Sequence, residues 1–257
     1  MSTTNILITG TKAGIGQGLV KALVARPNTT IIAAIRDAPT SPKAKAMVDS
    51  VTTFGKDSRI IPVEYDAASP TAAQDMIKSL ESSHPEIKHL DLVVANAGIA
   101  TQWGPTYAVT AKEVQDHLAV NTAGPVFLYQ ATRNLLLASK GTPKFFLMST
   151  VIGSITAGPS IPFQTVLYGM SKAAGNYFTV KANLEEDRLV IVPVHPGWVQ
   201  TDMGNIAATN LGMDSPPMTL DQSVEGLVKI FDSATKETGG TFQSVSEQKD
   251  GSKVLPW

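Results

Sequence analysis

Short apolar segments recur along the chain with helical stretches between them, and this alternation constrains the fold more than any other feature. Seven segments are apolar enough to form strands: Asn5–Thr9, Thr30–Ile35, Ile60–Tyr65, Leu90–Ala95, Lys144–Ser149, Leu189–His195 and Thr241–Val245. Several are apolar at nearly every position, as expected of strands that are covered on both faces. The pattern predicts a doubly wound α/β fold, with a seven-stranded parallel sheet flanked by helices.

The whole chain, residues 1–257, is predicted to be one domain. The stretches between the strands have helical spacing, as in Leu19, Leu23 and Val24, and no linker or repeat interrupts them. Residues 201–219 differ, because three methionines and two prolines lie there without a clear period. We expect a mobile loop or short helix over a substrate pocket, the alternative being a partly ordered surface connection.

Composition excludes several classes of protein. The formal net charge is −1, and no basic run is dense enough for nucleic acid or an anionic membrane surface. The absence of cysteine excludes disulfides and thiolate chemistry, and the four histidines lack metal-ligand spacing, so no metal site is expected. No stretch is apolar over the roughly 20 residues of a membrane helix, and Met1–Asn5 is too polar and short to begin a signal peptide. We expect a cytoplasmic location.

A glycine-rich turn follows the first predicted strand. Gly10, Gly14 and Gly16 lie between that strand and a helical pattern. Such a turn lets backbone amides and the helix N-terminus approach a pyrophosphate, which indicates a Rossmann-type nucleotide site. The spacing G-x-x-x-G-x-G departs from the commoner G-x-G-x-x-G, and glycine also occurs at such turns for backbone reasons alone.

Arg36 ends the second predicted strand, where a Rossmann-type fold holds the adenosine ribose. An arginine at this position accommodates a 2′-phosphate, and Lys12 in the glycine turn adds a second positive charge. The pair favours NADP(H) over NAD(H) as cofactor. The alternative is that Arg36 is a solvated residue at a strand end, beside Asp37.

Tyr168 and Lys172 are four residues apart at the start of a helical stretch, which places both side chains on one helix face. A tyrosine with an ordinary pKa near 10 is a poor acid–base group at neutral pH. A neighbouring ammonium stabilises the phenolate, so we expect Lys172 to lower the pKa of Tyr168. An isolated Y-x-x-x-K also occurs by chance in helices.

Six motifs in register resemble the short-chain dehydrogenase/reductase family over essentially the whole chain. They are the glycine turn, Asn96-Ala97-Gly98, Asn121, Ser149-Thr150, the pair Tyr168 and Lys172, and Pro196-Gly197. Asp250-Gly251 and Pro256-Trp257 are similar to the branch that contains norsolorinic acid ketoreductase-like, C-factor and sniffer-type carbonyl reductases.

The resemblance implies a catalytic tetrad. Tyr168 would be the acid, and Lys172 would bind the nicotinamide ribose and lower the Tyr168 pKa. Asn121 would hold a bend in its helix and a water that links Lys172 to solvent. A hydroxyl at the end of the fifth strand would polarise the substrate carbonyl.

The identity of that hydroxyl is open. The family usually reads Ser-Ser-x-x-Gly with the second serine catalytic, whereas this chain has Ser149-Thr150 before Val151-Ile152-Gly153. The register favours Thr150, whose hydroxyl has the same donor and acceptor capacity. A shift of one residue would substitute Ser149, because successive strand residues point to opposite faces. Ser154 is a third candidate.

The remaining cofactor contacts are implied by position in the resemblance. Asp66 would hold the adenine ring, Asn96 would lie along the adenosine ribose, and Val199 and Thr201 would bind the nicotinamide carboxamide. The full set of expected cofactor-binding residues is Gly10, Lys12, Gly14, Ile15, Gly16, Arg36, Asp66, Asn96, Gly98, Tyr168, Lys172, Pro196, Gly197, Val199 and Thr201.

These features imply an NADPH-dependent reductase of a small-molecule ketone or aldehyde. The methionine-rich region 201–219 has no Lys or Arg, which favours an apolar, aromatic or polyketide-like substrate. Two alternatives remain: an NADP-dependent dehydrogenase that oxidises an alcohol, and a protein that senses NADP(H) without turnover. The resemblance also implies a homodimer or homotetramer.

Overall fold

The computed structural model describes residues 3–248 and 251–257, so Asp250 of the C-terminal motif lies outside the described residues. Within these ranges seven strands form one parallel sheet. They are β1 (Thr4–Thr9), β2 (Thr29–Ile35), β3 (Arg59–Glu64), β4 (Leu92–Ala95), β5 (Lys144–Met148), β6 (Val190–His195) and β7 (Gln243–Ser244). Each overlaps a predicted segment, and the predicted fold is confirmed.

The helices alternate with the strands along the chain. The α-helices are α1 (Gly14–Val24), α2 (Pro42–Asp49), α3 (Ala72–Ser83), α4 (Ala111–Leu118), α5 (Gly124–Leu137), α6 (Val166–Leu184), α7 (Asp202–Asn210) and α8 (Leu220–Ser233). Short 3₁₀ turns are η1 (Thr106–Ala108), η3 (Val151–Gly153) and η4 (Gly158–Ser160), and a π-helical turn, η2 (Ala119–Ala123), joins α4 to α5. No helix of the described residues has both the length and the apolar composition needed to cross a membrane.

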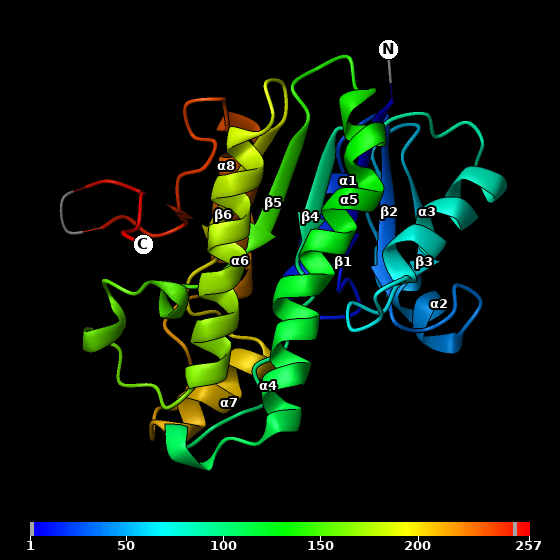
Figure 1. Cartoon of the computed structure of the whole chain (residues 1–257). Coiled ribbons are helices and arrows are strands. Elements are labelled where there is room, and N and C mark those ends of the chain that lie inside the picture. The colour runs from blue at the N-terminus through cyan, green and yellow to red at the C-terminus, as the bar shows by residue number, and fades with distance from the viewer. Residues whose placement is uncertain (1–2, 249–250) are drawn as a thin grey trace.

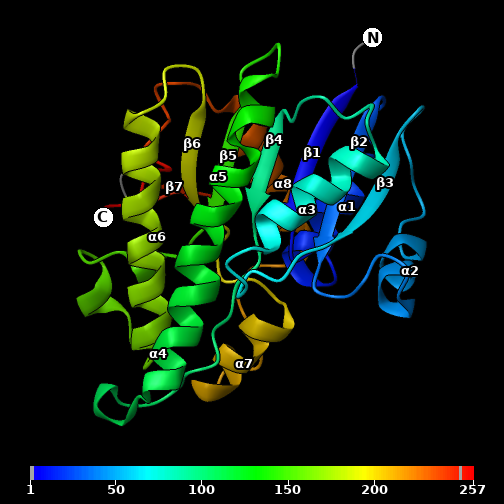
Figure 2. The same cartoon turned by 45° about the vertical axis from the view of Figure 1, so that its right-hand side comes forward.

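Helices cover both faces of the sheet (Figures 1 and 2), and an apolar core lies between the sheet and the helices on each face. Along β1, Leu7 packs with α3, α5 and α6, whereas Ile6 and Ile8 pack with α1 and α8 on the opposite face. A strand covered on both faces has no polar alternation, which is why the strand segments read as continuous apolar runs.

The strand order is β3-β2-β1-β4-β5-β6-β7. The chain therefore reverses direction across the sheet between β1 and β4. In open α/β sheets the crevice at such a switch point, beyond the carboxyl ends of the strands, is where ligands bind. The glycine turn follows β1 and Asn96 follows β4, so both border this crevice.

Candidate active site

The glycine turn after β1 has a backbone that only glycine adopts without strain. Gly10 and Gly14 have φ of +69° and +54°, and a Cβ on Gly16 would lie 2.2 Å from the Gly10 carbonyl oxygen. No side chain caps α1, whose N-cap residue is Ala13, and no acidic residue lies in its first turn. Ile15, in the first turn of α1, is partly buried against the core. The first amides of α1 are therefore open to an anion.

Hydrogen bonds from Asn96 connect this turn to the end of β4. Its Nδ2 donates to the carbonyl oxygens of Thr9 at 2.9 Å and Gly10 at 3.3 Å. The Thr9 hydroxyl in turn accepts from the backbone amides of Asn96 and Ala97, both at 3.0 Å. The resemblance placed Asn96 along the adenosine ribose, but its side-chain amide here faces the glycine turn and shapes it.

Arg36 lies exposed at the end of β2 and forms no ion pair with any described residue. Its neighbour Asp37 pairs instead with Lys43, whose Nζ lies 3.0 Å from Asp37 Oδ1. That hydrogen bond lowers the pKa of Asp37, and the nearby charges of Lys12 and Arg36 lower it further. Arg36 and the exposed Lys12 thus lie near Asp37, whose carboxylate is already paired with Lys43.

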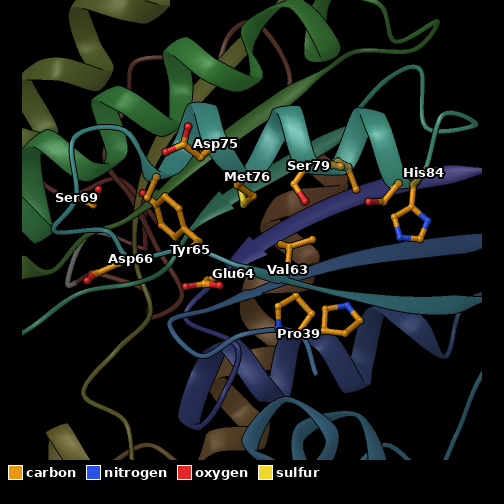
Figure 3. A pocket seen from close by; sticks show the side chains of 14 residues that line it. Pro39, Val63, Glu64, Tyr65, Asp66, Ser69, Asp75, Met76, Ser79 and His84 are labelled. Atoms are coloured by element: carbon orange, nitrogen blue, oxygen red, sulfur yellow. The ribbon is translucent and has the colours of Figure 1, made fainter. Parts of the chain in front are cut away.

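Asp66 follows β3 at the outer edge of the sheet, and its Oδ1 accepts from the Ala68 amide at 3.0 Å. It borders a cavity of about 590 Å³ between β3 and α3. Figure 3 shows Val63 and Tyr65 on the strand side of this cavity and Met76 on the helix side. None of the candidate catalytic residues lines it, so its size does not mark it as the reaction site.

The resemblance implied a bend at Asn121, and a π-helical turn, η2, lies there between α4 and α5. The buried Asn121 side chain donates through Nδ2 to Ile99 O at 2.8 Å and to Ser171 Oγ at 3.0 Å. Its Oδ1 accepts from the Ile99 amide at 2.9 Å. A Cβ on Gly98 would lie 3.1 Å from Asn121 Oδ1 and 3.4 Å from Lys172 Nζ. Gly98 therefore leaves the space in which these two side chains approach the loop after β4.

Tyr168 and Lys172 lie on one face of α6, as predicted. The Lys172 side chain is 2% exposed, and its Nζ donates to the Met148 carbonyl oxygen at 2.7 Å, at the end of β5. The same Nζ lies 5.8 Å from the centroid of the Tyr168 ring, within range of a cation–π contact.

The pKa values of this pair follow burial. Burial lowers the pKa of Lys172 to about 8 and raises that of Tyr168 to about 12. The Tyr168 pKa is therefore shifted in the direction opposite to the prediction, because desolvation of the phenolate raises it. Near neutral pH, Tyr168 keeps its proton and Lys172 is mainly charged.

The three candidate hydroxyls lie in different surroundings. Buried Ser149 donates its proton to Asn176 Oδ1 at 2.6 Å, between β5 and α6. Thr150 Oγ1 only accepts, from the Ile152 amide at 3.3 Å, so its proton is not used in that contact. Ser154 Oγ accepts from the Ala157 amide at 3.0 Å.

The segment after β6 closes the site against the glycine turn. Gly197 has φ of +89°, and a Cβ there would lie 2.4 Å from the Met218 sulfur. Buried Val199 pairs with Met218 in a β-bridge, and a Cβ on Gly14 would lie 3.3 Å from Thr201 Cγ2. The start of region 201–219 is therefore held beside the glycine turn, where Thr201 caps α7.

Pro196, the residue before Gly197, is held in place by a hydrogen bond from α8. Its carbonyl oxygen accepts from the buried Ser223 hydroxyl at 2.7 Å, so α8 positions this part of the segment. Region 201–219 itself contains α7 followed by an irregular stretch.

Sequence reasoning missed two buried residues that support the site. Ser171 bonds to Asn121, and His117 accepts through Nε2 from the Thr101 amide at 3.3 Å in the loop after β4. Their signal is positional: Ser171 directly precedes Lys172, and His117 lies four residues before Asn121, on the same helix face.

Comparisons with known proteins agree with this geometry. A family model described as short chain dehydrogenase matches residues 4–211. The norsolorinic acid ketoreductase of Aspergillus parasiticus is 39% identical over 255 residues, covering 99% of this chain and 91% of that protein. The corresponding ketoreductase of Dothistroma septosporum is 38% identical over 257 residues, covering 99% and 92%.

Solved structures give the same relationship. The NADPH-bound carbonyl reductase from chicken fatty liver has a TM-score of 0.82 and 26% identity, with both chains covered completely. Carbonyl reductase Sniffer of D. melanogaster has a TM-score of 0.80 and 26% identity, covering 99% of this chain and 100% of that one. The resemblance read from the six motifs is confirmed, and the chain belongs to the short-chain dehydrogenase/reductase family.

Proposed function

We propose that the protein reduces an apolar ketone or aldehyde to an alcohol with NADPH. The observation that carries this proposal is the buried Lys172 ammonium, fixed by Met148 O at the end of β5 and lying 5.8 Å from the Tyr168 ring centroid. A buried charge beside a protonated phenol is expensive to maintain and is typical of an acid–base site. The ketoreductase relatives support a carbonyl substrate.

The crevice fits a dinucleotide phosphate. The uncapped N-terminus of α1 and the left-handed backbone at Gly10 and Gly14 suit a pyrophosphate. Arg36 and Lys12 suit the 2′-phosphate, because Asp37 is already paired with Lys43. The chicken liver reductase was solved with NADPH bound, which supports the same choice here. The bound nicotinamide would supply the hydride.

Other residues would hold the cofactor at its two ends. We assign Gly16, Ile15, Asp66, Asn96 and Gly98 to the adenosine and pyrophosphate part. We assign Pro196, Gly197, Val199 and Thr201, which lie on the segment after β6, to the nicotinamide part.

Within the tetrad, Tyr168 would donate its proton to the carbonyl oxygen of the substrate. Lys172 would hold the nicotinamide ribose and keep positive charge beside the phenolate that forms. Asn121 would maintain the turn η2 and, through its two hydrogen bonds to Ile99, the position of the loop after β4.

We assign the polarising hydroxyl to Thr150. Ser149 already donates its proton to Asn176, whereas Thr150 Oγ1 accepts from Ile152 and retains a proton to donate. A donor aimed at the carbonyl oxygen stabilises the negative charge that develops there.

We further propose that the protein forms a homodimer or homotetramer through α6. Met170, Tyr177 and Leu184 expose apolar side chains seven residues apart on this helix. Such a stripe is typical of a surface that packs against another helix. Light scattering coupled to size-exclusion chromatography tests this point.

The function is tested by following NADPH absorbance with purified protein and a panel of apolar ketones and aldehydes, and with the matching alcohols plus NADP⁺. Reduction of at least one ketone, faster with NADPH than with NADH, is the expected result. NADPH binding without turnover of any compound in either direction would favour the cofactor-sensing alternative.

A further inference from the structure

Two buried nitrogen atoms near the end of β5 lack a hydrogen-bond partner among the described residues. They are Nδ2 of Asn176, on α6, and Nδ1 of His195, the last residue of β6. Both atoms are almost without solvent-accessible surface. A buried polar atom without a partner is unfavourable and rare in folded proteins, so both nitrogens call for a contact that completes their hydrogen bonding.

The strand register brings His195 beside Ser149. Met148 pairs with Val194 in the parallel ladder, and the Ser149 amide donates to the Val194 carbonyl oxygen at 2.8 Å. Ser149 and His195 are the next residues on these two strands, and neighbours at equal register point to the same face of a sheet. The Ser149 hydroxyl reaches Asn176 on α6. The His195 side chain therefore lies on the same face, next to the Ser149–Asn176 bond.

The two nitrogens are chemically complementary. The Asn176 Nδ2 can only donate. His195 is neutral near pH 7, because burial lowers its pKa to about 4, and a neutral imidazole has one nitrogen that accepts. The two atoms are not bonded directly, and one buried water that accepts from Asn176 Nδ2 and donates to His195 Nδ1 would satisfy both. This arrangement requires the tautomer of His195 with its proton on Nε2.

The orientation of the Asn176 amide decides which way the Ser149 hydroxyl is used. With Nδ2 turned away from Ser149, Oδ1 accepts the Ser149 proton, as observed. Were the amide turned over, Nδ2 would donate to Ser149 Oγ, and the Ser149 proton would be free beside Thr150. The two orientations have the same shape, so a partner that only accepts from Nδ2 is needed to select one of them.

We propose that His195 is a positioning residue for the reaction: through one buried water it fixes the Asn176 amide, which holds Ser149 and thereby the hydroxyl of Thr150. The inference rests on the proposed reductase function and deepens it. Ser149 directly precedes Thr150 in the chain, so the anchored Ser149 side chain restricts movement of the hydroxyl that we assign to the substrate carbonyl.

The tautomer of His195 is measured by long-range proton–nitrogen NMR correlation on the full chain near neutral pH. Its signal is identified by its loss in His195→Asn. We expect the proton on Nε2, and we expect Asn176→Leu to shift the Nδ1 resonance because the bonded water loses its second partner. A proton on Nδ1 would overturn the proposal, and so would an Nδ1 resonance that Asn176→Leu does not move. The wild-type tautomer decides the matter even if Asn176→Leu does not fold.

Steady-state kinetics give a second readout. His195→Phe keeps a ring but removes both nitrogens, and it should lower kcat by about fivefold with NADPH affinity close to wild type. His195→Asn can place an amide oxygen where Nδ1 lies and should restore kcat. His84→Phe is the matched control, at a partly exposed histidine that caps the C-terminus of α3, and should leave kcat unchanged. A loss in His195→Asn equal to that in His195→Phe would overturn the role of Nδ1.

A double-variant cycle separates positioning from a general loss of stability. In a Thr150→Ala background, His195→Phe should lower kcat no further, because the hydroxyl that it positions is already gone. Losses that multiply would contradict the proposal. The NMR measurement needs no substrate, so the bond to His195 is decided even if no carbonyl compound is reduced, and the two proposals can fail separately.

Discussion

The Ser149 hydroxyl donates a hydrogen bond to Asn176 Oδ1 at 2.6 Å in the buried interface between β5 and α6. Asn176 is 3% exposed, and its Nδ2 has no partner among the described residues. The bond from Ser149 is therefore the hydrogen bond that the Asn176 side chain makes among these residues. This relationship gives Ser149 a structural task and separates it from its neighbour Thr150.

Thr150→Ala should lower kcat by about 10²-fold with NADPH affinity nearly unchanged, because a donor to the developing oxyanion is lost. Ser149→Ala should instead lower the free energy of unfolding by about 1–3 kcal/mol, since it leaves the Asn176 amide unpaired, and should affect kcat less. Steady-state kinetics and urea denaturation of both variants measure this, with Thr150→Ser as the rescue. The reverse ranking of kcat would show that Ser149 supplies the hydroxyl, and no effect of either on kcat would direct attention to Ser154.

Cofactor preference should depend on Arg36. We expect NADPH to bind at least about tenfold more tightly than NADH, and Arg36→Ala to abolish most of that preference by removing a cation from the 2′-phosphate. Fluorescence titration of both cofactors measures it. Arg59→Ala is the control, because Arg59 is an exposed arginine at the start of β3 that pairs with Glu86. A preference that survives Arg36→Ala would remove this basis for the NADP(H) assignment.

The pH dependence of reduction should follow Lys172. Its pKa is lowered by burial to about 8, so its positive charge is present below that pH and lost above it. The Tyr168 proton, with a pKa raised to about 12, remains in place over the same range. We therefore expect kcat/KM for reduction to be level below about pH 8 and to fall above it. Lys172→Arg should move the fall upward, and a profile that rises through this range would contradict the assignment.

His195, at the end of β6, should make stability fall in acid. Burial lowers its pKa from 6.5 to about 4, and its Nδ1 has no partner among the described residues. The unfolded chain binds a proton in this interval that the folded chain does not, so the contribution is complete above about pH 6.5 and lost toward about pH 4. We expect a loss of about 1–3 kcal/mol in the free energy of unfolding, measured by urea denaturation. His195→Gln should lack this component, and parallel curves for wild type and variant would refute it.

The fold could be predicted from sequence because its signals are local. The apolar run Thr30–Ile35 differs by one residue from β2, and the glycine turn and the Tyr168/Lys172 spacing each lie within a few residues. The length of β7 was harder to predict, since only Gln243–Ser244 of the predicted segment Thr241–Val245 forms a strand. β7 lies at the edge of the sheet, where it pairs with a single neighbouring strand.

The geometry of the site could not be predicted in the same way, because it depends on contacts between distant parts of the chain. The Ser149–Asn176 bond joins residues 27 positions apart, and no local pattern distinguishes Ser149 from Thr150 without it. The direction of the Tyr168 pKa shift depends on burial, which the spacing of Tyr168 and Lys172 does not show.

Tyr168→Phe tests the central claim most directly, because it keeps the ring and its packing while removing the group assigned to proton donation. We expect kcat for carbonyl reduction to fall by roughly 10²-fold or more, with NADPH affinity and the melting temperature close to wild type. Tyr107→Phe is the matched control, an equal change at a side chain that is 93% exposed, and should leave kcat unchanged. Near-normal reduction by Tyr168→Phe, measured from NADPH absorbance under saturating cofactor, would contradict the account.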